Sequence, residues 1–121
     1  LTGHTGSVTA VSTAVAPDGT LLVVTGSQDR TAVVWDAVTG ARLHTLTGHR
    51  NWIQAVETTA TPDGIPVAIT TSQDSSAVVW DLRSGKEMHH CALQYSGGPV
   101  VATRTGFLVA YWREVASFVW S

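Results

Sequence analysis

The sequence predicts an all-β protein built from repeated units of four short antiparallel strands. The first observation behind this prediction is an internal repeat: residues 1–45 return as residues 46–90, with 21 of the 45 aligned positions identical. The second is a series of short apolar segments separated by turn sequences such as Pro17-Asp18-Gly19 and Pro62-Asp63-Gly64. The third is that no segment shows the apolar spacing of an amphipathic helix.

Each complete unit is expected to hold its four strands in the same order. The run from residue 21 to 25 is apolar and bounded by turn residues, which is typical of a strand buried on both faces. The last strand of each unit is more polar, so we expect it at the outer edge. The predicted strands are 7–15, 21–25, 31–35 and 42–47 in the first unit, and 52–59, 66–70, 76–80 and 87–92 in the second.

The third unit, residues 91–121, is degenerate and truncated. Three strands are expected in it, at 97–103, 106–111 and 116–120. The chain ends before a fourth strand. We therefore predict one domain made of units 1–45, 46–90 and 91–121.

Composition and charge exclude several classes of function. Only 13% of the residues are charged, which predicts that much of the surface is covered. The net charge is −2 with no block of like charges, and this argues against binding to nucleic acid or to a membrane surface. No apolar run is long enough to span a bilayer. The lone Cys91 forms no intrachain disulfide, so we expect a cytoplasmic protein.

The chain begins with Leu1 rather than Met, so we expect it to be a fragment of a longer protein. Lys86 stands alone against six arginines, and Ala, Val and Thr are plentiful. We interpret this composition as that of a high-GC bacterial source.

Four landmarks recur in the same order in both complete units. They are a Gly-His pair, a Pro-Asp-Gly turn, an Asp in the next turn, and a Trp-Asp pair that ends an apolar strand. In this order they resemble the WD-repeat family. The resemblance implies β-propeller blades of four antiparallel strands, with about 2.7 blades in this chain.

The resemblance also implies one structural hydrogen-bond network in each blade. The members are His4, Thr25, Asp29 and Trp35 in the first blade, and His49, Thr70, Asp74 and Trp80 in the second. A buried polar group without a partner costs roughly 1–3 kcal/mol, so complete pairing stabilises the blade. A His, an Asp and a hydroxyl also resemble a catalytic set. Because the set recurs once per blade, we interpret it as scaffold and expect no catalytic residues.

Trp52 is the leading candidate for contact with a partner. Its counterpart in the first unit is Ser7, so the repeat itself does not need an aromatic residue there. It follows Arg50 and Asn51 in a loop where the resemblance implies the top face of the propeller, and Trp and Arg are frequent at binding hot spots. The alternative is that Trp52 shields a neighbouring blade. Further candidates in the matching turns are Gln28, Arg30, Gln73, Ser75 and Trp112.

The leading functional prediction is a noncatalytic protein–protein interaction scaffold from a larger bacterial regulatory or signalling protein, with no cofactor. An enzymatic propeller such as a quinone-cofactor dehydrogenase is the alternative, because residues 36–40 resemble part of that family's repeat. However, His44 stands near the position where that family has a docking Trp. A metal site at His89-His90-Cys91 is not expected, because adjacent strand residues point to opposite faces.

A propeller closes with about four to eight blades, so this chain needs further blades. We expect a longer chain to supply them. The alternative is a self-assembling structural propeller made from several copies.

Overall fold

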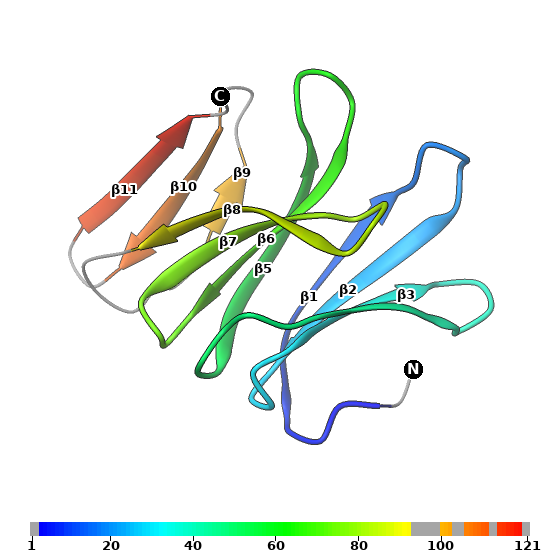
Figure 1. Cartoon of the computed structure of the whole chain (residues 1–121), viewed down its shortest axis with the longest axis horizontal. Helices are drawn as coiled ribbons and strands as arrows, with labels where there is room; N and C mark the ends of the chain where they lie inside the picture. Colours follow the sequence, from blue (N-terminus) through cyan, green and yellow to red (C-terminus); the bar gives the residue numbers. More distant parts are fainter. Residues whose placement is uncertain (1–2, 93–99, 103–105, 112–113, 120–121) are drawn as a thin grey trace.

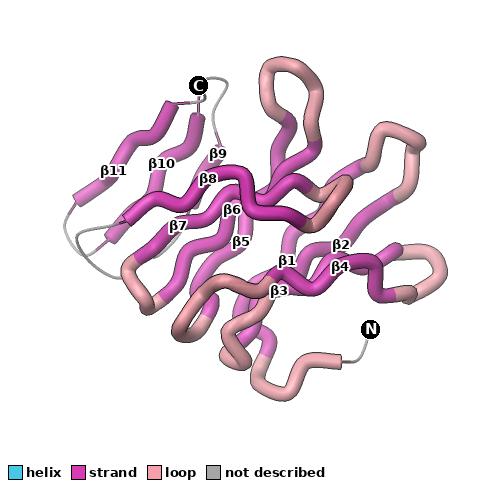
Figure 2. The backbone as a smooth tube through the Cα atoms, viewed as in Figure 1, coloured by secondary structure: helices cyan, strands magenta, loops and turns pink. Residues whose placement is uncertain are grey.

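The computed structural model confirms the all-β class (Figure 1). It describes residues 3–92, 100–102, 106–111 and 114–119, and these form antiparallel sheets with no helix among them. Figure 2 shows the strands joined by short loops, without helical segments in the described part of the chain. Trp112, one of the predicted partner contacts, lies outside the described residues.

The two complete blades are four-stranded meanders in which each strand pairs with the next one along the chain. The first sheet contains β1 (Val8–Val15), β2 (Leu21–Ser27), β3 (Ala32–Asp36) and β4 (Arg42–Leu46). The second contains β5 (Ile53–Ala60), β6 (Pro66–Ser72), β7 (Ser76–Asp81) and β8 (Lys86–Ala92). A third sheet has the order β11-β10-β9 and contains β9 (Val100–Ala102), β10 (Gly106–Tyr111) and β11 (Glu114–Val119).

The second strand of each blade is longer than predicted. We expected β2 to end at Thr25, with Gly26 in the turn, but Gly26 pairs with both Ala10 and Ala32. A glycine is required here by close packing rather than by a turn. A Cβ at Gly26 would lie 2.4 Å from Cγ2 of Ile53, the first residue of β5.

Turns alternate between the two ends of the sheets. At one end, the Pro-Asp-Gly turns place Gly19 and Gly64 at φ values of 87° and 85°, which are open to glycine. At the other end, the turns after β2 and β6 place Arg30 and Ser75 at φ values of 76° and 65°. We call the end with the Pro-Asp-Gly turns the lower edge, although it is drawn at the top of Figure 1, and the end with Arg30 and Ser75 the upper edge.

The blades stack through two apolar cores. β1 lies beside β5, and β5 lies beside β9, so these are the inner strands of successive blades. The core between the first two blades includes Leu22, Val24, Val34, Leu46, Ala68, Val78, Trp80 and Leu82. The core between the second and third includes Val67, Ile69, Ala77, Val79 and Val100. The second blade is therefore covered on both faces, and all seven residues of β6 are buried.

Hydroxyl groups link the inner strands β1 and β5. The hydroxyl of Thr9 donates to the carbonyl of Ile53, and Oγ of Ser12 lies 2.8 Å from Oγ1 of Thr58. The hydroxyl of Thr58 in turn donates to the carbonyl of Thr13. Side-chain hydrogen bonds thus fix the position of one blade against the next where backbone pairing is absent.

Candidate functional site

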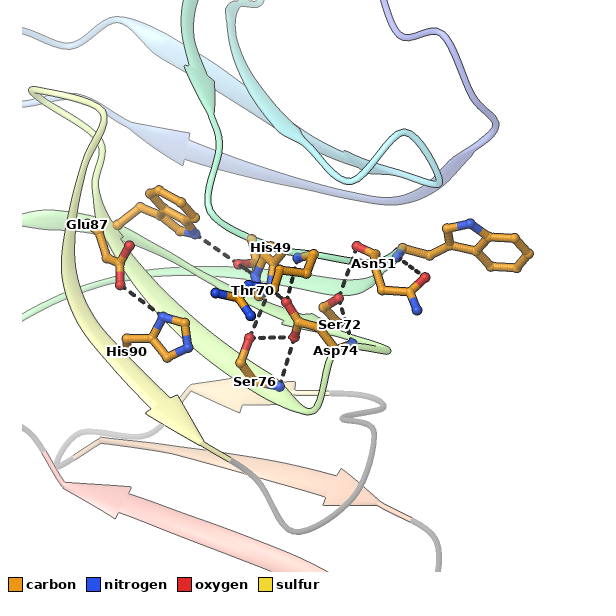
Figure 3. A network of polar contacts seen from close by, with 11 residues as sticks. His49, Asn51, Thr70, Ser72, Asp74, Ser76, Glu87 and His90 are labelled. Atoms are coloured by element: carbon orange, nitrogen blue, oxygen red, sulfur yellow. Dashed lines mark hydrogen bonds and ion pairs between the residues drawn. The ribbon is translucent and has the colours of Figure 1, made fainter.

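The polar network of the second blade begins at Trp80 in β7 and ends at the turn after β6 (Figure 3). The indole N–H of Trp80 donates to Oγ1 of Thr70 over 2.8 Å. Oγ1 of Thr70 lies 2.6 Å from Nε2 of His49, and Nδ1 of His49 lies 3.0 Å from Oδ2 of Asp74. Since Thr70 accepts the indole proton, its own proton is available to Nε2. A neutral imidazole with its proton on Nδ1 then satisfies the whole chain of groups.

Burial favours this neutral form of His49. Loss of solvent lowers the pKa of the imidazole, while the hydrogen bond and the negative charge of Asp74 oppose the shift without reversing it. His49 is therefore neutral at pH 7, as the direction of its hydrogen bonds requires. The residue is 7% exposed.

Each aspartate of the two networks accepts four donors. Oδ2 of Asp74 accepts from the backbone N–H of Arg50 and from His49, and Oδ1 accepts from the N–H and hydroxyl of Ser76. Burial raises the pKa of Asp74, but these hydrogen bonds outweigh it and the net shift is downward. The carboxylate stays ionised and ties the 48–52 loop to the turn after β6.

The first blade repeats this geometry. The indole nitrogen of Trp35 lies 2.9 Å from Oγ1 of Thr25, which lies 2.7 Å from Nε2 of His4. Nδ1 of His4 lies 2.8 Å from Oδ2 of Asp29. Burial opposes ionisation of Asp29, yet hydrogen bonds from Thr31, His4 and Thr5 lower its pKa to about 2. The structure thus brings together all eight residues expected in the networks, in two sets of four.

The arrangement has the order of a catalytic set but lacks an exposed hydroxyl in the second blade. Thr70, His49 and Asp74 have the order of a nucleophile, base and orienting acid. However, Thr70 is fully buried, and its oxygen already accepts the indole proton. The burial of this hydroxyl and its hydrogen bonds fit a role in positioning the strands of the blade.

Two further hydroxyl residues complete the network of each blade, and they were not predicted from the sequence. They are Ser27 and Thr31 in the first blade, and Ser72 and Ser76 in the second. Oγ of Ser27 and of Ser72 accepts the backbone N–H of Asp29 and of Asp74 respectively, each over 3.1 Å. Thr31 and Ser76 donate their hydroxyls to the same two aspartates. The signal was available, because each is a hydroxyl residue at the same position in both repeats.

The predicted partner contacts within the described residues gather at the upper edge. Arg30, Arg50, Asn51, Trp52 and Gln73 are exposed, and Gln28 and Ser75 are half-buried. The packing of Gly26 on Ile53 brings the 27–31 turn close to the 48–52 loop. Within the described residues, neither Arg30 nor Arg50 forms an ion pair.

Trp52 is the most unusual of these residues. Its side chain is 44% exposed, although the backbone that carries it is well restrained. The carbonyl of Trp52 accepts the N–H of Gln73 over 3.0 Å, and its own N–H donates to Oδ1 of Asn51 over 2.8 Å. Asn51 lies beside Ser72 and Asp74 in Figure 3. A large apolar side chain is thus held in solvent on a fixed loop.

Comparison with known proteins decides between the propeller families. The model of the WD domain, G-beta repeat, matches residues 1–36 and 40–81. The chain belongs to the WD-repeat family. This WD-repeat chain is also similar to Protein Mut11 of Chlamydomonas reinhardtii, with 56% identity over 45 residues. That match covers 37% of the chain and 11% of the relative, so the chain spans a small part of the relative's length.

Two further properties concern metals and membranes. In the part of the WD-repeat chain that the structure describes, no three His, Cys, Asp or Glu side chains are grouped as metal ligands would be. His90 instead lies 3.1 Å from Glu87 on β8, and both side chains are well exposed. None of the described residues forms a helix capable of crossing a membrane.

Proposed function

We propose that this chain is part of a noncatalytic scaffold that binds a protein partner at its upper edge, with Trp52 as the central contact. The observation that carries the proposal is the exposure of Trp52 on a restrained loop. Membership of the WD-repeat family supports it, because these repeats generally mediate protein–protein interactions. The second repeat has gained an aromatic side chain where the first has Ser7, and the blade network does not use it.

The rigidity of the loop favours tight binding. Arg50 is fixed through its backbone N–H on Asp74, and Trp52 through its carbonyl on Gln73. A loop that is already ordered loses little conformational entropy on association, so more of the contact energy appears as affinity. Trp and Arg are also among the residue types enriched at binding hot spots.

Charge gives the expected character of the partner. Arg30 and Arg50 add two positive charges to the upper edge. Asp29 and Asp74 are ionised as well, but their side chains are only 11% and 10% exposed and accept four donors each, so the arginines are the charged groups that a partner can reach. The upper edge therefore favours a partner segment that carries acidic residues beside an apolar one.

We further propose that the remaining blades come from a longer chain, which acts in cytoplasmic regulation or signalling. The open face of the first blade supports this. Val11 is 63% exposed and Leu21 is 43% exposed. Val56, the repeat counterpart of Val11, packs against the interblade core, and Pro66, the counterpart of Leu21, is buried. A further blade covering the first would bury the same positions there. Assembly from several copies is the alternative, and the bacterial source stays a prediction.

The test is a selection of peptides from a random library on the immobilised chain, followed by affinity measurement on variants. Trp52→Ser installs the residue of the first repeat, and Val38→Ser removes an 84% exposed apolar side chain at the lower edge. We expect Trp52→Ser to weaken binding about tenfold or more and Val38→Ser to have no effect. If the selected peptides bound Trp52→Ser with the same affinity as Val38→Ser, the proposed contact would be refuted.

A further inference from the structure

A cavity of about 480 Å³ opens at the lower edge, between the first two blades and away from Trp52. The most buried leucines in its lining are Leu22 of the first blade and Leu82 of the second, which are each 3% exposed. Leu43 of β4 also lines the cavity and is 43% exposed. We call this cavity the interblade groove. Its apolar lining suits the methylene groups of an inserted side chain.

Two carboxylates of the first blade stand at the rim of the groove. Asp18 accepts the N–H of Thr20 through Oδ1 over 2.9 Å. Asp36 likewise uses Oδ1, which accepts the N–H of Val38 over 2.9 Å and of Thr39 over 3.1 Å. These bonds hold both side chains in place. Hydrogen bonds from Thr20 lower the pKa of Asp18, so it is ionised at neutral pH.

The cation at the opposite rim does not neutralise these carboxylates. Arg83 of the second blade lines the groove, but its guanidinium is held by Asp81. Nε donates to Oδ1 of Asp81 over 3.1 Å, and Nη2 donates to Oδ2 over 2.8 Å. No ion pair among the described residues involves Asp18 or Asp36. The groove therefore carries negative charge at its entrance.

We propose that the interblade groove binds an arginine side chain from an extended segment of a partner protein. The aliphatic part of arginine would lie along the three leucines. Its guanidinium would donate to the carboxylates of Asp18 and Asp36, where several N–H groups in one plane can engage two acceptors. The volume lies in the range of small-ligand pockets and leaves room for the backbone on either side of the arginine.

A metal ion fits the groove less well. Calcium takes six to eight oxygen ligands and magnesium six, but among the described residues that line the groove, Asp18, Thr20 and Asp36 are those whose side chains carry oxygen. A partner residue with an apolar stem and a cationic tip matches both the leucines and the carboxylates of the groove. The site is independent of the upper edge, so failure of one proposal leaves the other standing.

The experiment is a titration of the isotope-labelled 121-residue chain with an acetylated, amidated Gly-Gly-Arg-Gly-Gly peptide, followed by amide NMR shifts. The matched probe is the same peptide with citrulline in place of arginine, which keeps the shape of the side chain and removes its charge. We expect saturable shifts at the groove amides, including those of Leu43 and Arg83, with a Kd of roughly 1 mM. The citrulline peptide should leave these amides unshifted, and Trp52 should not respond to either peptide.

Variants then locate the interaction. Asp18→Asn and Asp36→Asn should each weaken binding about threefold, and the double variant about tenfold, because each removes one exposed ion pair. Asn keeps an oxygen for the turn, so the spectra of the free variants should match the native one. The control is Asp63→Asn, which removes the same charge at the repeat counterpart of Asp18 but outside the groove lining.

Four results would overturn the proposal. They are equal binding of the citrulline peptide, equal weakening by Asp63→Asn, shifts that lie away from the groove, and shifts that do not saturate. Each of them would assign the effect to general electrostatics or to another surface.

Discussion

The first and second blades have the same internal geometry but different surroundings. The Trp–Thr distance is 2.9 Å in one network and 2.8 Å in the other, and the Thr–His distance is 2.7 Å and 2.6 Å. Burial differs much more. β6 is buried along its whole length, whereas β2, its counterpart, begins at an exposed Leu21. The polar network is therefore a property of each blade, and burial of the apolar strands is a property of the stack.

The covering of the two tryptophans shows the same distinction. Trp80 packs in the core shared by the first two blades. Both tryptophans are also covered by the segment that precedes their blade, since a Cβ at Gly48 would lie 3.1 Å from the indole of Trp80, but Trp35 is not part of an interblade core among the described residues. Gly3 lies so close that a Cβ there would be 3.3 Å from the indole of Trp35, and the guanidinium carbon of Arg42 is 5.4 Å from the ring centre. The two indoles are thus equally exposed, at 2%, but only Trp80 packs against a neighbouring blade as well.

The largest expected effect separates these two tryptophans. Trp80→Ala should lower the free energy of unfolding by about 4 kcal/mol, because it empties the core between blades and leaves Thr70 without its donor. Trp35→Ala should cost less, since mobile side chains such as Arg42 can move into the space. Urea unfolding followed by circular dichroism measures both. Equal losses would mean that the covering segment packs as firmly as a blade.

The next comparison concerns the aspartates. Asp74→Asn should lower the free energy of unfolding by about 3 kcal/mol, because one of its oxygens becomes a donor that faces two other donors. Asp29→Asn should act in the same direction through His4 and Thr5. Asp63→Asn, at an exposed turn, serves as the matched control and should change stability little. A loss at Asp74 no larger than that at Asp63 would contradict the role of the four donors.

As the pH is lowered from neutral, the first loss of stability should come from His49. Its pKa in the folded chain lies below the ordinary value of 6.5, so the unfolded chain binds the proton more readily. Stability is therefore full above pH 6.5 and falls as the pH drops from 6.5 towards the folded pKa. A second decline, between pH 3.8 and about 2, is expected from Asp29, whose folded carboxylate resists protonation.

The matched variant for this prediction is His49→Gln, measured by urea unfolding at a series of pH values. The substitution lowers stability overall, but the part of the slope just below pH 6.5 that belongs to His49 should vanish. An unchanged slope in that range would show that another group is responsible. The acid decline should persist in the His49 variant and become smaller in Asp29→Asn, where the lowered pKa of Asp74 still contributes to it.

The smallest expected effect tests the open face. Val11→Thr should change the unfolding free energy of the 121-residue chain by less than about 0.5 kcal/mol, since Val11 is 63% exposed. Val56→Thr, at the repeat counterpart, should cost about 1 kcal/mol because Val56 packs against the interblade core. In a longer chain with a preceding blade, the two substitutions should become equally costly. A large effect of Val11→Thr in the isolated chain would mean that this face is already covered.

Much of the blade could be predicted from the sequence, because each landmark residue occurs at the same position in two repeats. The turn residues and apolar runs located the strands of both complete blades, and matching of the repeats located His49, Thr70, Asp74 and Trp80. These contacts depend on residues within one repeat. Ser72 and Ser76 were open to the same reasoning, since each has a hydroxyl counterpart in the first repeat.

Contacts between blades could not be predicted in this way. Gly26 was expected in a turn because glycine is typical of turns, yet it continues β2 to make room for Ile53 of the next blade. The bonds from Thr9 and Ser12 to β5, and the meeting of Leu22 with Leu82 in the interblade groove, also depend on how two sheets face each other. The spacing of residues along the chain does not indicate how two sheets face each other.

The hydroxyl bonds between β1 and β5 have a consequence for curvature. Polar atoms of Ser12 and Thr58 meet at 2.8 Å near the inner strands, while side chains as large as Leu46 and Trp80 fill the space farther out. Each blade is thus a wedge, with its narrow side pinned and its wide side set by apolar volume. The arc traced by successive wedges depends on the size of the outer side chains. Adding or removing methyl groups there would change the radius of the circle while leaving every inner bond in place.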